Sequence, residues 1–469
     1  MDEPARQLPI IELFPAPELG NTTFMVADPD SGKAVVIDPL RDVDQYLSRA
    51  ESLRTTIIGA VETHVHNDFV SGSRELQQEV GATIWAADTS ELEFPFDHLG
   101  EGSEILVGRW RIRARRTPGH TPQHLSYVLL DGSGRPAVLF SGGALMVGTV
   151  ARTDLFGPHM AVPLAKQAFL TLHRRLADLP DDVAVFPTHG GGSFCGAAKS
   201  DQTTTTVGHE RRTNPLFQAT ELMPFIARVL AQNPYPTYYN RMTPLNRAGV
   251  PLVGRRLPEL SDLDPDRVAQ LMAEGVAVVD IRPSQEYDQG HIPGSYSIGL
   301  DTTFSAWVGW LIPHQRPMLL VGDGDDDLRQ AHRQLIRIGY DNVLGFLRGG
   351  LAAWLDGGRR VSAFQTAKIE DLANWMLEAR TLTVLDVRES SEWAGGHIPS
   401  AIHSPAHQLA DTSAGISKDV PVAIYCAAGY RSGIAASILE QAGFRDIIHI
   451  LGGFEDWQAL GLPVTESKA

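Results

Sequence analysis

Residues 63–72 read THVHNDFVSG and follow an apolar, β-rich run at residues 56–61, TIIGAV. The run predicts a buried strand, and the polar stretch predicts a loop that carries the imidazoles of His64 and His66 and the carboxylate of Asp68. Ligating side chains at i, i+2 and i+4 on a loop are typical of a metal site, and imidazole with carboxylate suits Zn, Fe or a similar metal. A polar loop that holds two histidines by chance is the alternative.

Two further histidines follow predicted strands. His120 lies in a Pro/Gly turn after the strand 110–115, and His189 follows the apolar strand 183–186. Core packing is a poor explanation for three separate histidine loops at strand ends. With these motifs the chain resembles the metallo-β-lactamase fold over residues 8–250, and within it the persulfide dioxygenase and glyoxalase II branch. The resemblance implies an αβ/βα sandwich with the metal at one edge.

Length and composition limit the classes of protein that the chain can represent. Its 469 residues suggest about three domains at roughly 150 residues each, and its 43% apolar and 20% charged content is that of a globular protein. The net charge of −16 argues against nucleic acid or an anionic membrane as a partner.

The expected compartment follows from the cysteines and from the start of the chain. Two cysteines make a disulfide framework unfavourable and indicate a reducing compartment. Residues 1–9 lack the apolar core of a signal peptide, and no uncharged stretch reaches the roughly 18–20 residues of a membrane span. We expect a cytoplasmic α/β protein, with a homo-oligomer as an open alternative.

Alternating hydrophobicity predicts the elements of the first domain. Two hairpins and three helices are expected, the hairpins at 22–37 and 125–140 and the helices at 41–53, 73–80 and 163–177. Residues 200–260 are expected to form an appendage. Its aromatic, Pro-rich segment 233–239 is interpreted either as a wall of a substrate pocket or as packing between domains.

From residue 258 onward the sequence contains an internal repeat. Its motifs are VVDIR at 278–282 with GHIPG at 290–294, then VLDVR at 384–388 with GHIPS at 396–400. The spacing from Asp to His is 11 residues in both copies, and the copies end alike, with LRGGLAAW at 347–354 and ILGGFEDW at 450–457.

The repeat resembles two consecutive rhodanese domains, at 262–361 and 366–465. Asp280 with Arg282, and Asp386 with Arg388, are expected to form structural ion pairs rather than to take part in catalysis.

The loop YCAAGYRS at 425–432 follows a strand and precedes a helix. Cys426 therefore lies among backbone N–H groups that converge on a helix N-terminus, which favours its thiolate and anionic partners, and Arg431 adds positive charge. In rhodaneses this cysteine accepts a sulfane sulfur, becomes a persulfide and passes the sulfur on. The resemblance implies that role for Cys426, with Gly429 in the substrate-binding loop; a buried structural cysteine is the alternative.

The first copy departs from this pattern. Aligning strand 318–321 with strand 422–425 places Gly322 where Cys426 stands. The loop GDGDDD at 322–327 has no nucleophile and would repel an anionic sulfur donor. We expect this copy to be inactive, as a structural spacer or a docking surface.

The first domain also departs from its family. The resemblance implies one Fe(II) held by two histidines and a carboxylate, with His64 and His120 in the histidine positions and Gly143 in the carboxylate position. Phe69 replaces the histidine of a second metal, which argues against a two-metal hydrolase. The remaining ligand candidates are His64, His66, His120, Asp68 and His189. The three histidines His64, His66 and His120, with Asp68 and His189 nearby, predict a three-histidine Zn site, a weaker iron site or a vestigial site.

Two more residues are substrate-binding candidates. The segment GGGSFCG at 190–196 resembles a loop of persulfide dioxygenase–rhodanese fusions, so Cys195 is expected near the substrate thiol or as a buried small hydrophobe. Arg152 is expected to bind a substrate carboxylate or to form a structural salt bridge.

Three functions remain open. The leading hypothesis is an enzyme of sulfur metabolism that oxidises a thiol persulfide (of glutathione, coenzyme A or another thiol) to sulfite at one Fe(II), and that transfers sulfane sulfur, as from thiosulfate, through Cys426. One alternative is a sulfurtransferase whose first domain is only a binding scaffold. The other is a mononuclear Zn(II) thioester hydrolase.

Overall fold

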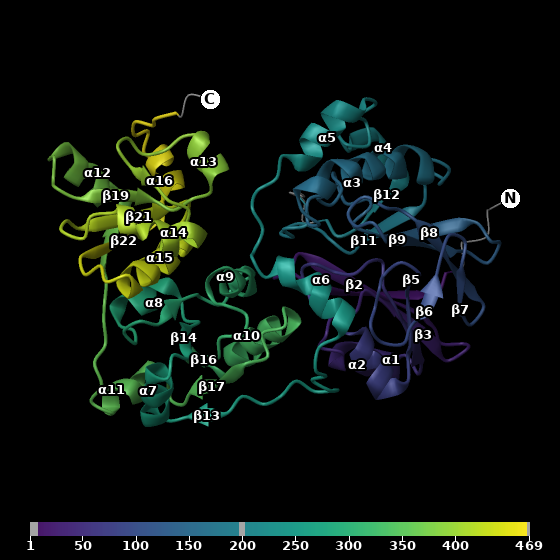
Figure 1. The fold of residues 1–469 in the computed structure, drawn as a ribbon, viewed down its shortest axis with the longest axis horizontal. Helices are drawn as coiled ribbons and strands as arrows, with labels where there is room; N and C mark the ends of the chain where they lie inside the picture. Colours follow the sequence, from purple (N-terminus) through teal and green to yellow (C-terminus); the bar gives the residue numbers. More distant parts are fainter. Residues whose placement is uncertain (1–7, 197–201, 467–469) are drawn as a thin grey trace. The chain divides into compact units, whose positions relative to one another are not determined.

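The computed structural model of the protein describes residues 8–196 and 202–466 (Figure 1). The chain forms two compact units. The N-terminal unit comprises Met1–Pro258 with Leu335–Gly339, and the C-terminal unit comprises Glu259–Gln334 with Tyr340–Ala469. Residues 1–7, on which the expectation of no signal peptide partly rests, lie outside the described residues. The three predicted domain ranges stay predictions.

The N-terminal unit is built on two six-stranded sheets. The first sheet has the order β1 (Ile10–Ala16), β2 (Asn21–Asp28), β3 (Lys33–Ile37), β4 (Thr56–Val61), β5 (Thr83–Ala87) and β6 (Asp97–Leu99). The second has the order β12 (Thr205–Thr206), β11 (Ala184–Pro187), β10 (Pro136–Gly142), β9 (Leu125–Leu130), β8 (Trp110–Arg116) and β7 (Glu104–Val107).

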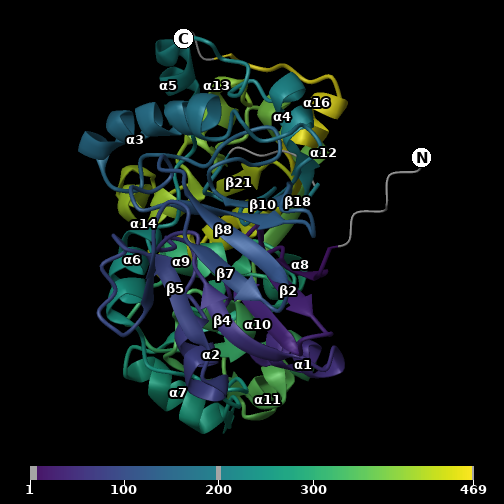
Figure 2. The same cartoon turned by 90° about the vertical axis from the view of Figure 1, so that its right-hand side faces the viewer.

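Alternating side chains explain the layers of this unit. On β2, Phe24 and Val26 enter the core between the two sheets, whereas Met25 and Ala27 enter a second core under helices. Helices α1 (Asp44–Ser52) and α2 (Ser73–Val80) cover the first sheet, and α3 (Pro158–Leu170) and α5 (Leu222–Leu230) cover the second. The predicted αβ/βα sandwich is confirmed, and Figure 2 shows its sheets from the side.

Both predicted hairpins and the helix at 73–80 are confirmed. The helix predicted at 163–177 is partly wrong. It begins at Pro158, where a missing N–H would be unpaired in any case, and it continues as a π-helix at Thr171–Arg175. Thr171 Oγ1 donates to the carbonyl of Pro118 at 2.7 Å, so the wide turn is fastened to the loop that carries His120.

The C-terminal unit contains two five-stranded parallel sheets with one strand order. The first runs β13 (Asp262–Leu263), β17 (Val343–Leu347), β16 (Met318–Val321), β14 (Ala277–Asp280) and β15 (Tyr296–Ser297). The second runs β18 (Gln365–Lys368), β22 (Ile447–Gly453), β21 (Val422–Cys426), β19 (Thr383–Asp386) and β20 (Ile402–His403). Equivalent strands occupy equivalent places, which confirms the repeat.

The helices of the two copies follow the same succession. The first copy has α7 (Pro265–Ala273), α8 (Ser284–Gln289), α9 (Phe304–Leu311), α10 (Asp325–Arg337) and α11 (Gly350–Asp356). The second has α12 (Ile369–Leu377), α13 (Ser390–Ala394), α14 (Leu409–Thr412), α15 (Tyr430–Gln441) and α16 (Phe454–Ala459).

The expected structural ion pairs are confirmed, and they explain the fixed spacing of the repeat. Arg282 Nε lies 2.9 Å from Asp280 Oδ1, and Arg388 Nε lies 3.0 Å from Asp386 Oδ1. Each arginine also donates to the glycine carbonyl that opens the next motif, at 3.0 Å in the first copy and 2.8 Å in the second. The arginine therefore joins the two motifs of each copy.

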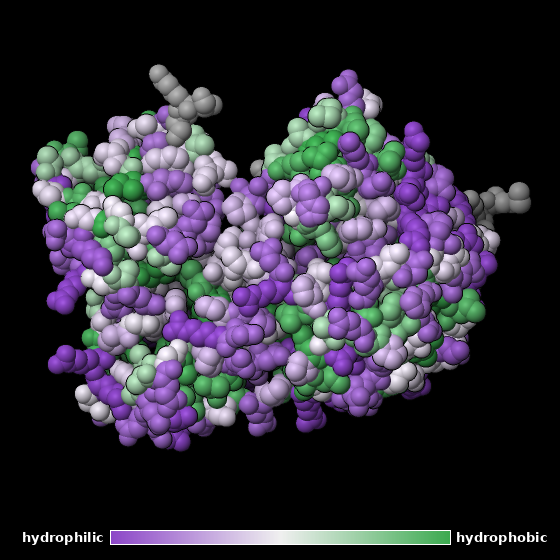
Figure 3. Space-filling model, in the orientation of Figure 1, coloured by the Kyte–Doolittle hydropathy of each residue, from purple (hydrophilic) through white to green (hydrophobic). Residues whose placement is uncertain are grey.

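The surface is largely polar on the face that Figure 3 shows, with an apolar group over α3 and α5. Met223 of α5 is 70% exposed. Among the described helices, none combines the length and the apolar character that a membrane span requires.

Candidate functional site

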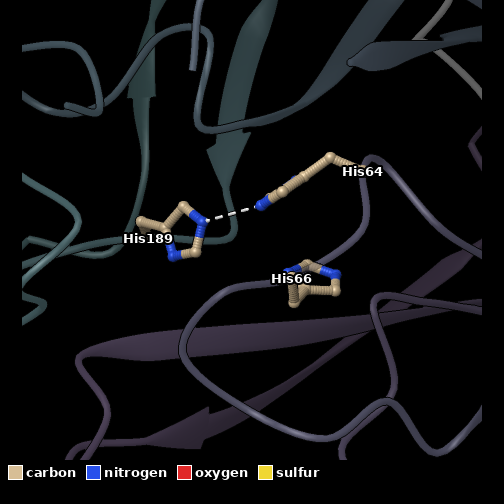
Figure 4. A group of neighbouring side chains, drawn as sticks. All are labelled: His64, His66 and His189. Carbon is tan, nitrogen blue, oxygen red and sulfur yellow. Dashed lines mark hydrogen bonds between the residues drawn. The ribbon is translucent and has the colours of Figure 1, made fainter. Parts of the chain in front are cut away.

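Loops that follow strands of both sheets bring buried imidazoles together in the N-terminal unit. His64 and His66 follow β4, His120 follows β8 and His189 follows β11. The Nε2 atoms of His64 and His189 face each other at 3.3 Å (Figure 4). His64, His66 and His189 form one group whose ligand atoms lie within 4.8 Å of one another, and His120, His189 and Cys195 form a second.

Hydrogen bonds on the far side of each ring decide which nitrogen carries a lone pair. Thr63 Oγ1 donates to Asp38 Oδ2 at 2.7 Å, so it accepts from Nδ1 of His64 at 2.8 Å. His64 is therefore protonated on Nδ1, and its Nε2 keeps a free lone pair.

The same reasoning applies to His189. Asn21 donates through Nδ2 to Asp68 at 2.6 Å, so its Oδ1 accepts from Nδ1 of His189 at 2.9 Å. The Nε2 of His189 is on the opposite side of the ring and faces Nε2 of His64 at 3.3 Å.

His120 completes the set. Its Nδ1 donates to the carbonyl of Arg152 at 2.7 Å, and its buried Nε2 has no hydrogen-bond partner among the described residues. Burial and the neighbouring imidazole of His189 lower the pKa of His120 to about 3, so the ring is neutral at physiological pH.

These three rings fit a divalent metal ion. Two nitrogens bound at about 2.0–2.1 Å to a tetrahedral ion lie about 3.3 Å apart, and the Nε2 atoms of His64 and His189 have that separation. The orphaned Nε2 of His120 supplies a third nitrogen donor, and partners on each Nδ1 hold the rings in place.

His66 makes different contacts from the other histidines. Its Nε2 lies 3.2 Å from both Asp38 and Glu62, and its ring stacks on Phe69 at a centroid distance of 4.1 Å. Burial alone would lower the pKa of His66, but the two carboxylates raise it to about 10. These contacts favour a role for His66 as a protonated, supporting side chain beside the metal site over its predicted role as a metal ligand.

Asp68 helps to orient His189, because one of its two carboxylate oxygens is engaged by Asn21 beside that ring. Its Oδ2 accepts from Asn21 and lies 3.4 Å from Nδ1 of His189. Burial would raise the pKa of Asp68, but the imidazoles of His189 and His66 and the Asn21 hydrogen bond hold it at about 2. Asp68 is therefore ionised and secures the tautomer of His189 through Asn21.

Neighbouring atoms occupy the space that a carboxylate at position 143 would need. A Cβ on Gly143 would lie 2.8 Å from Cδ2 of His120 and 2.8 Å from Cβ of Ala151. The N–H of Gly143 donates to Nε2 of His124 at 3.0 Å, and Nδ1 of His124 contacts Thr117 at 2.9 Å. His124 has both nitrogens engaged and is not a ligand candidate.

The predicted appendage supports the metal-site loop. From α6 (Tyr239–Ala248), Asn246 Nδ2 donates to the carbonyls of His66 and Phe69 at 3.0 and 2.8 Å. Tyr238 donates to the carbonyl of Asp68 at 3.0 Å. Tyr238 of segment 233–239 therefore contacts the loop within the N-terminal unit, and α4 (Val207–Thr213) precedes the segment.

Cys195 and Arg152 lie beside the histidines. The Cys195 sulfur is one of the ligand atoms grouped with His120 and His189, and burial raises the pKa of this thiol well above its ordinary value. Arg152 is 3% exposed, and its three guanidinium nitrogens bind Asp154 and the carbonyls of Phe194 and Asn233. This placement favours the structural salt bridge for Arg152.

In the C-terminal unit, Cys426 ends β21 and α15 begins four residues later at Tyr430. Its Sγ accepts the N–H of Gly429 at 3.1 Å and faces Ser432 Oγ at 3.5 Å. Gly429 has φ +100°, which favours glycine. The loop thus turns two hydrogen-bond donors toward the sulfur.

Arg431 lies at the loop but is paired. Its two terminal nitrogens bind the carboxylate of Glu392 at 2.5 and 2.8 Å. Burial opposes its charge, but Glu392 raises the pKa of Arg431, so the cation persists with a partner.

In the equivalent loop of the first copy, the position that corresponds to Cys426 is crowded. A Cβ on Gly322 would lie 2.9 Å from Cγ1 of Ile281. Cys195 and Cys426 are the only cysteines of the chain, so the second copy alone carries a thiol.

Several supporting residues escaped the sequence analysis: Asn21, Asp38, Thr63, His124 and Ser432. Asp38 at the end of β3 and His124 in the His120 segment gave a weak local signal, since polar residues at strand ends gather near sites. Asn21 gave none, because its role depends on contact with residues 68 and 189.

Comparison with known proteins agrees with this architecture. Residues 16–189 match the metallo-beta-lactamase superfamily, and residues 264–356 and 369–460 each match the rhodanese-like domain. The mitochondrial persulfide dioxygenase ETHE1 of Homo sapiens is 31% identical over 199 residues, which are 41% of this chain and 70% of that protein. The probable metallo-hydrolase YqgX of Bacillus subtilis is 26% identical over 39% of this chain and 89% of its own.

One solved structure spans most of the chain. The metallo-beta-lactamase from Staphylococcus aureus subsp. aureus COL has 28% sequence identity and a TM-score of 0.66, and the match covers 72% of this chain and 99% of that one. Fold and site thus define a metallo-β-lactamase-fold metal domain followed by two rhodanese-like domains.

The chain belongs to the persulfide dioxygenase family of the metallo-β-lactamase superfamily, as a fusion with two rhodanese-like domains. These relationships assign it to sulfur metabolism as an enzyme, with a histidine-rich site for a divalent metal and with sulfur compounds as substrates.

Proposed function

We propose that the second rhodanese-like domain transfers sulfane sulfur through Cys426. The supporting observation is the position of Sγ, which receives the N–H of Gly429 and faces the hydroxyl of Ser432 at a helix N-terminus. The thiolate attacks the sulfane sulfur of thiosulfate, the S–S bond to the sulfonate breaks, and sulfite leaves with the electron pair. Cys426 is left as a persulfide anion for an acceptor thiol.

We further propose that the N-terminal domain oxidises a low-molecular-weight thiol persulfide. The balanced reaction is R–S–SH + O₂ + H₂O → RSH + SO₃²⁻ + 2H⁺, in which the outer sulfur is oxidised and O₂ is reduced. His64, His120 and His189 would hold the ion, and an Fe(II) bound there supplies the redox chemistry. Cys195 lies beside His120 and His189, where a substrate persulfide would approach.

Coupling of the two reactions follows from their chemistry. The N-terminal domain would release sulfite as its product, and Cys426 would carry sulfane sulfur. Each domain thus handles sulfur species that the other makes or uses. Glutathione or coenzyme A as the carrier thiol, and the cytoplasm as the compartment, belong to this proposal.

Oxygen consumption tests the N-terminal reaction. Purified protein reconstituted with Fe(II) and analysed for metal content is given glutathione persulfide. Oxygen uptake with sulfite release supports persulfide oxidation. An iron-loaded protein without uptake, in a sample whose Cys426 still transfers sulfur, contradicts it.

One observation favours a second candidate function for this domain. The donor set consists of imidazoles alone and the room at Gly143 is filled, as suits a three-histidine Zn(II) site that activates water to hydrolyse thioesters. Stoichiometric Zn with thioester turnover and no oxygen uptake would establish this alternative. No stoichiometric metal at all would leave the domain as a binding scaffold.

A further inference from the structure

A chain of buried polar groups leads from the first rhodanese-like copy to Cys426. Asp288 Oδ2 of α8 lies 2.7 Å from Nδ1 of His449 on β22. His449 Nε2 lies 3.0 Å from Ser432 Oγ, which faces Cys426 Sγ at 3.5 Å. Asp288 and His449 are each 1% exposed, so solvent does not screen their contact.

The neighbours of His449 define its protonation state. Asp288 is an acceptor for a proton on Nδ1. The carbonyl oxygen of Gly429 lies 3.0 Å from Nε2 and is an acceptor for a proton on that nitrogen. A ring protonated on both nitrogens would therefore have an acceptor on each side, the Asp288 carboxylate and the cysteine loop.

This arrangement determines where the single hydroxyl hydrogen of Ser432 goes. Ser432 Oγ can donate to the carbonyl of Gly429 at 2.9 Å or to Cys426 Sγ. When Nε2 of His449 donates to that carbonyl, the carbonyl keeps a donor even if the Ser432 hydroxyl points to the sulfur, 3.5 Å away. The thiolate thus gains a second donor beside the Gly429 N–H.

Asp288 belongs to the copy that has no cysteine. Its helix α8 packs against α15, whose N-terminus holds the Cys426 loop, and both lie in the C-terminal unit (Figure 1). A cavity of about 400 Å³ separates parts of the two copies and is lined by His449 and by Gly429.

We propose that Asp288 is a positioning residue for Cys426: the cysteine-less copy holds His449 as an imidazolium, which through Ser432 stabilises the thiolate and the persulfide anion. The inference rests on the proposed sulfur transfer through Cys426. The two copies then form one composite site.

The charge of the imidazolium supports both half-reactions. When Cys426 takes the sulfane sulfur, the negative charge moves from Sγ to the outer sulfur while sulfite departs. An acceptor thiol then takes the outer sulfur, R–SH becoming R–S–SH, and the Cys426 thiolate returns. His449 keeps its proton throughout, so the step needs no further reactant.

Other charged or titratable groups face this network from both copies. They are Asp301, Asp327 and Tyr430 around the cavity, and the Arg431–Glu392 pair at the other end of the loop. None of them contacts His449 in the network above, so an Asp288 substitution changes the charge balance at the ring directly.

The test is the pH dependence of Cys426 alkylation in the full-length protein, followed by mass spectrometry of the Cys426 peptide after iodoacetamide treatment. In Asp288→Asn the midpoint should rise by about one pH unit, so alkylation slows about tenfold below both midpoints. His449→Gln should give a similar shift, and the double variant should add little. The pH profile of thiosulfate-dependent persulfidation should move in parallel.

Glu440→Gln is the matched control. Glu440 contacts His291 between the same two copies at 3.3 Å but has no link to Cys426, so its midpoint should equal that of the wild type. An Asp288→Asn protein with the wild-type midpoint, or a Glu440→Gln protein with the same shift, overturns the inference. If Asp288→Asn does not fold, Ser432→Ala must show the shift, and a wild-type midpoint there overturns the inference too.

Alkylation does not require sulfur transfer, so the two proposals can fail separately. If the variants show the expected shifts of the alkylation midpoint but the wild-type protein transfers no sulfur, the proposed function is overturned and the positioning role is supported. A wild type that transfers sulfur with unshifted variants overturns the positioning role alone.

Discussion

Two loops of the molecule lack a residue that their families use, and they differ in what remains. At Gly143 the carboxylate is missing, yet three buried imidazoles still offer their Nε2 atoms as possible ligands. At Gly322 the cysteine is missing, and the loop offers no other nucleophile. In both places a neighbour has filled the room, the ring of His120 in one and the side chain of Ile281 in the other.

The two sites differ in how many residues their chemistry depends on. The metal centre has several donors, each held by its own hydrogen bond, so losing one leaves the others in position. The rhodanese loop has one reactive atom, and its loss ends the reaction in that copy. The first copy keeps its fold and its Asp280–Arg282 pair, and its Asp288 serves the site of its neighbour.

The largest expected effect is at the intact loop. Cys426→Ser should lower thiosulfate-dependent sulfur transfer by about a thousandfold or more, because a hydroxyl cannot carry the sulfur as a persulfide. Cyanide trapping of the sulfur as thiocyanate measures it. Cys195→Ser is the control and should transfer sulfur like the wild type. Sulfur transfer by the Cys426→Ser protein would show that the second rhodanese-like copy does not depend on this one reactive atom.

The next effect concerns a group that holds a metal donor. Asn21→Ala removes the acceptor on Nδ1 of His189 and should lower metal affinity about 10–100-fold, as loss of such a partner does. Competition with a chromogenic chelator measures the affinity. Asn342→Ala, in the C-terminal unit, should leave it unchanged. Equal metal affinities of the Asn21→Ala and wild-type proteins would show that His189 does not depend on its own hydrogen bond to stay in position.

Restoring a cysteine to the first copy should fail. Gly322→Cys places Cβ against Ile281, and overpacking of this kind costs about 1–3 kcal/mol. We expect weaker hydrogen-exchange protection around β16 and no sulfur on residue 322. Gly324→Cys has only ordinary contacts at its Cβ and should be stable. Persulfidation at residue 322 would show that the loop of the first copy can still support sulfur transfer once a cysteine is present.

The smallest effect is at the Arg431 pair. Burial would raise the pKa of Glu392, but Arg431 holds it below the ordinary value, so the pair stabilises the fold at neutral pH and loses this contribution as the pH falls through that lowered pKa. Glu392→Gln should cost less than about 1 kcal/mol at neutral pH, since the pair is partly exposed.

Melting temperatures measured against pH in the acid range test this pair. The difference between wild type and Glu392→Gln should vanish at low pH. The exposed Glu378→Gln should follow the wild type throughout. A difference that grows toward acid pH would reverse the assigned sign.

Local pattern was enough for much of the architecture. Motifs at fixed offsets predicted both rhodanese-like copies, because the arginine of one motif binds the glycine carbonyl of the next. Strand-end loops predicted His64, His120 and His189, because such loops meet at one edge of the sandwich.

Contacts between distant segments were beyond the reach of the sequence. The contact of His66 with Asp38 depends on the pairing of β3 with β4 in the first sheet, and the contact of His189 with Asn21 depends on how the two sheets meet. The π-helix after α3 depends likewise on a bond from Thr171 to the loop of residue 118.

The most direct test of the account is to map sulfur on the wild-type protein after incubation with thiosulfate. Peptide mass spectrometry should find one added sulfur atom per chain, on Cys426 alone. Sulfur on Cys195 instead, or no sulfur on either cysteine of a folded protein, would contradict the assignment of Cys426 as the sulfur carrier.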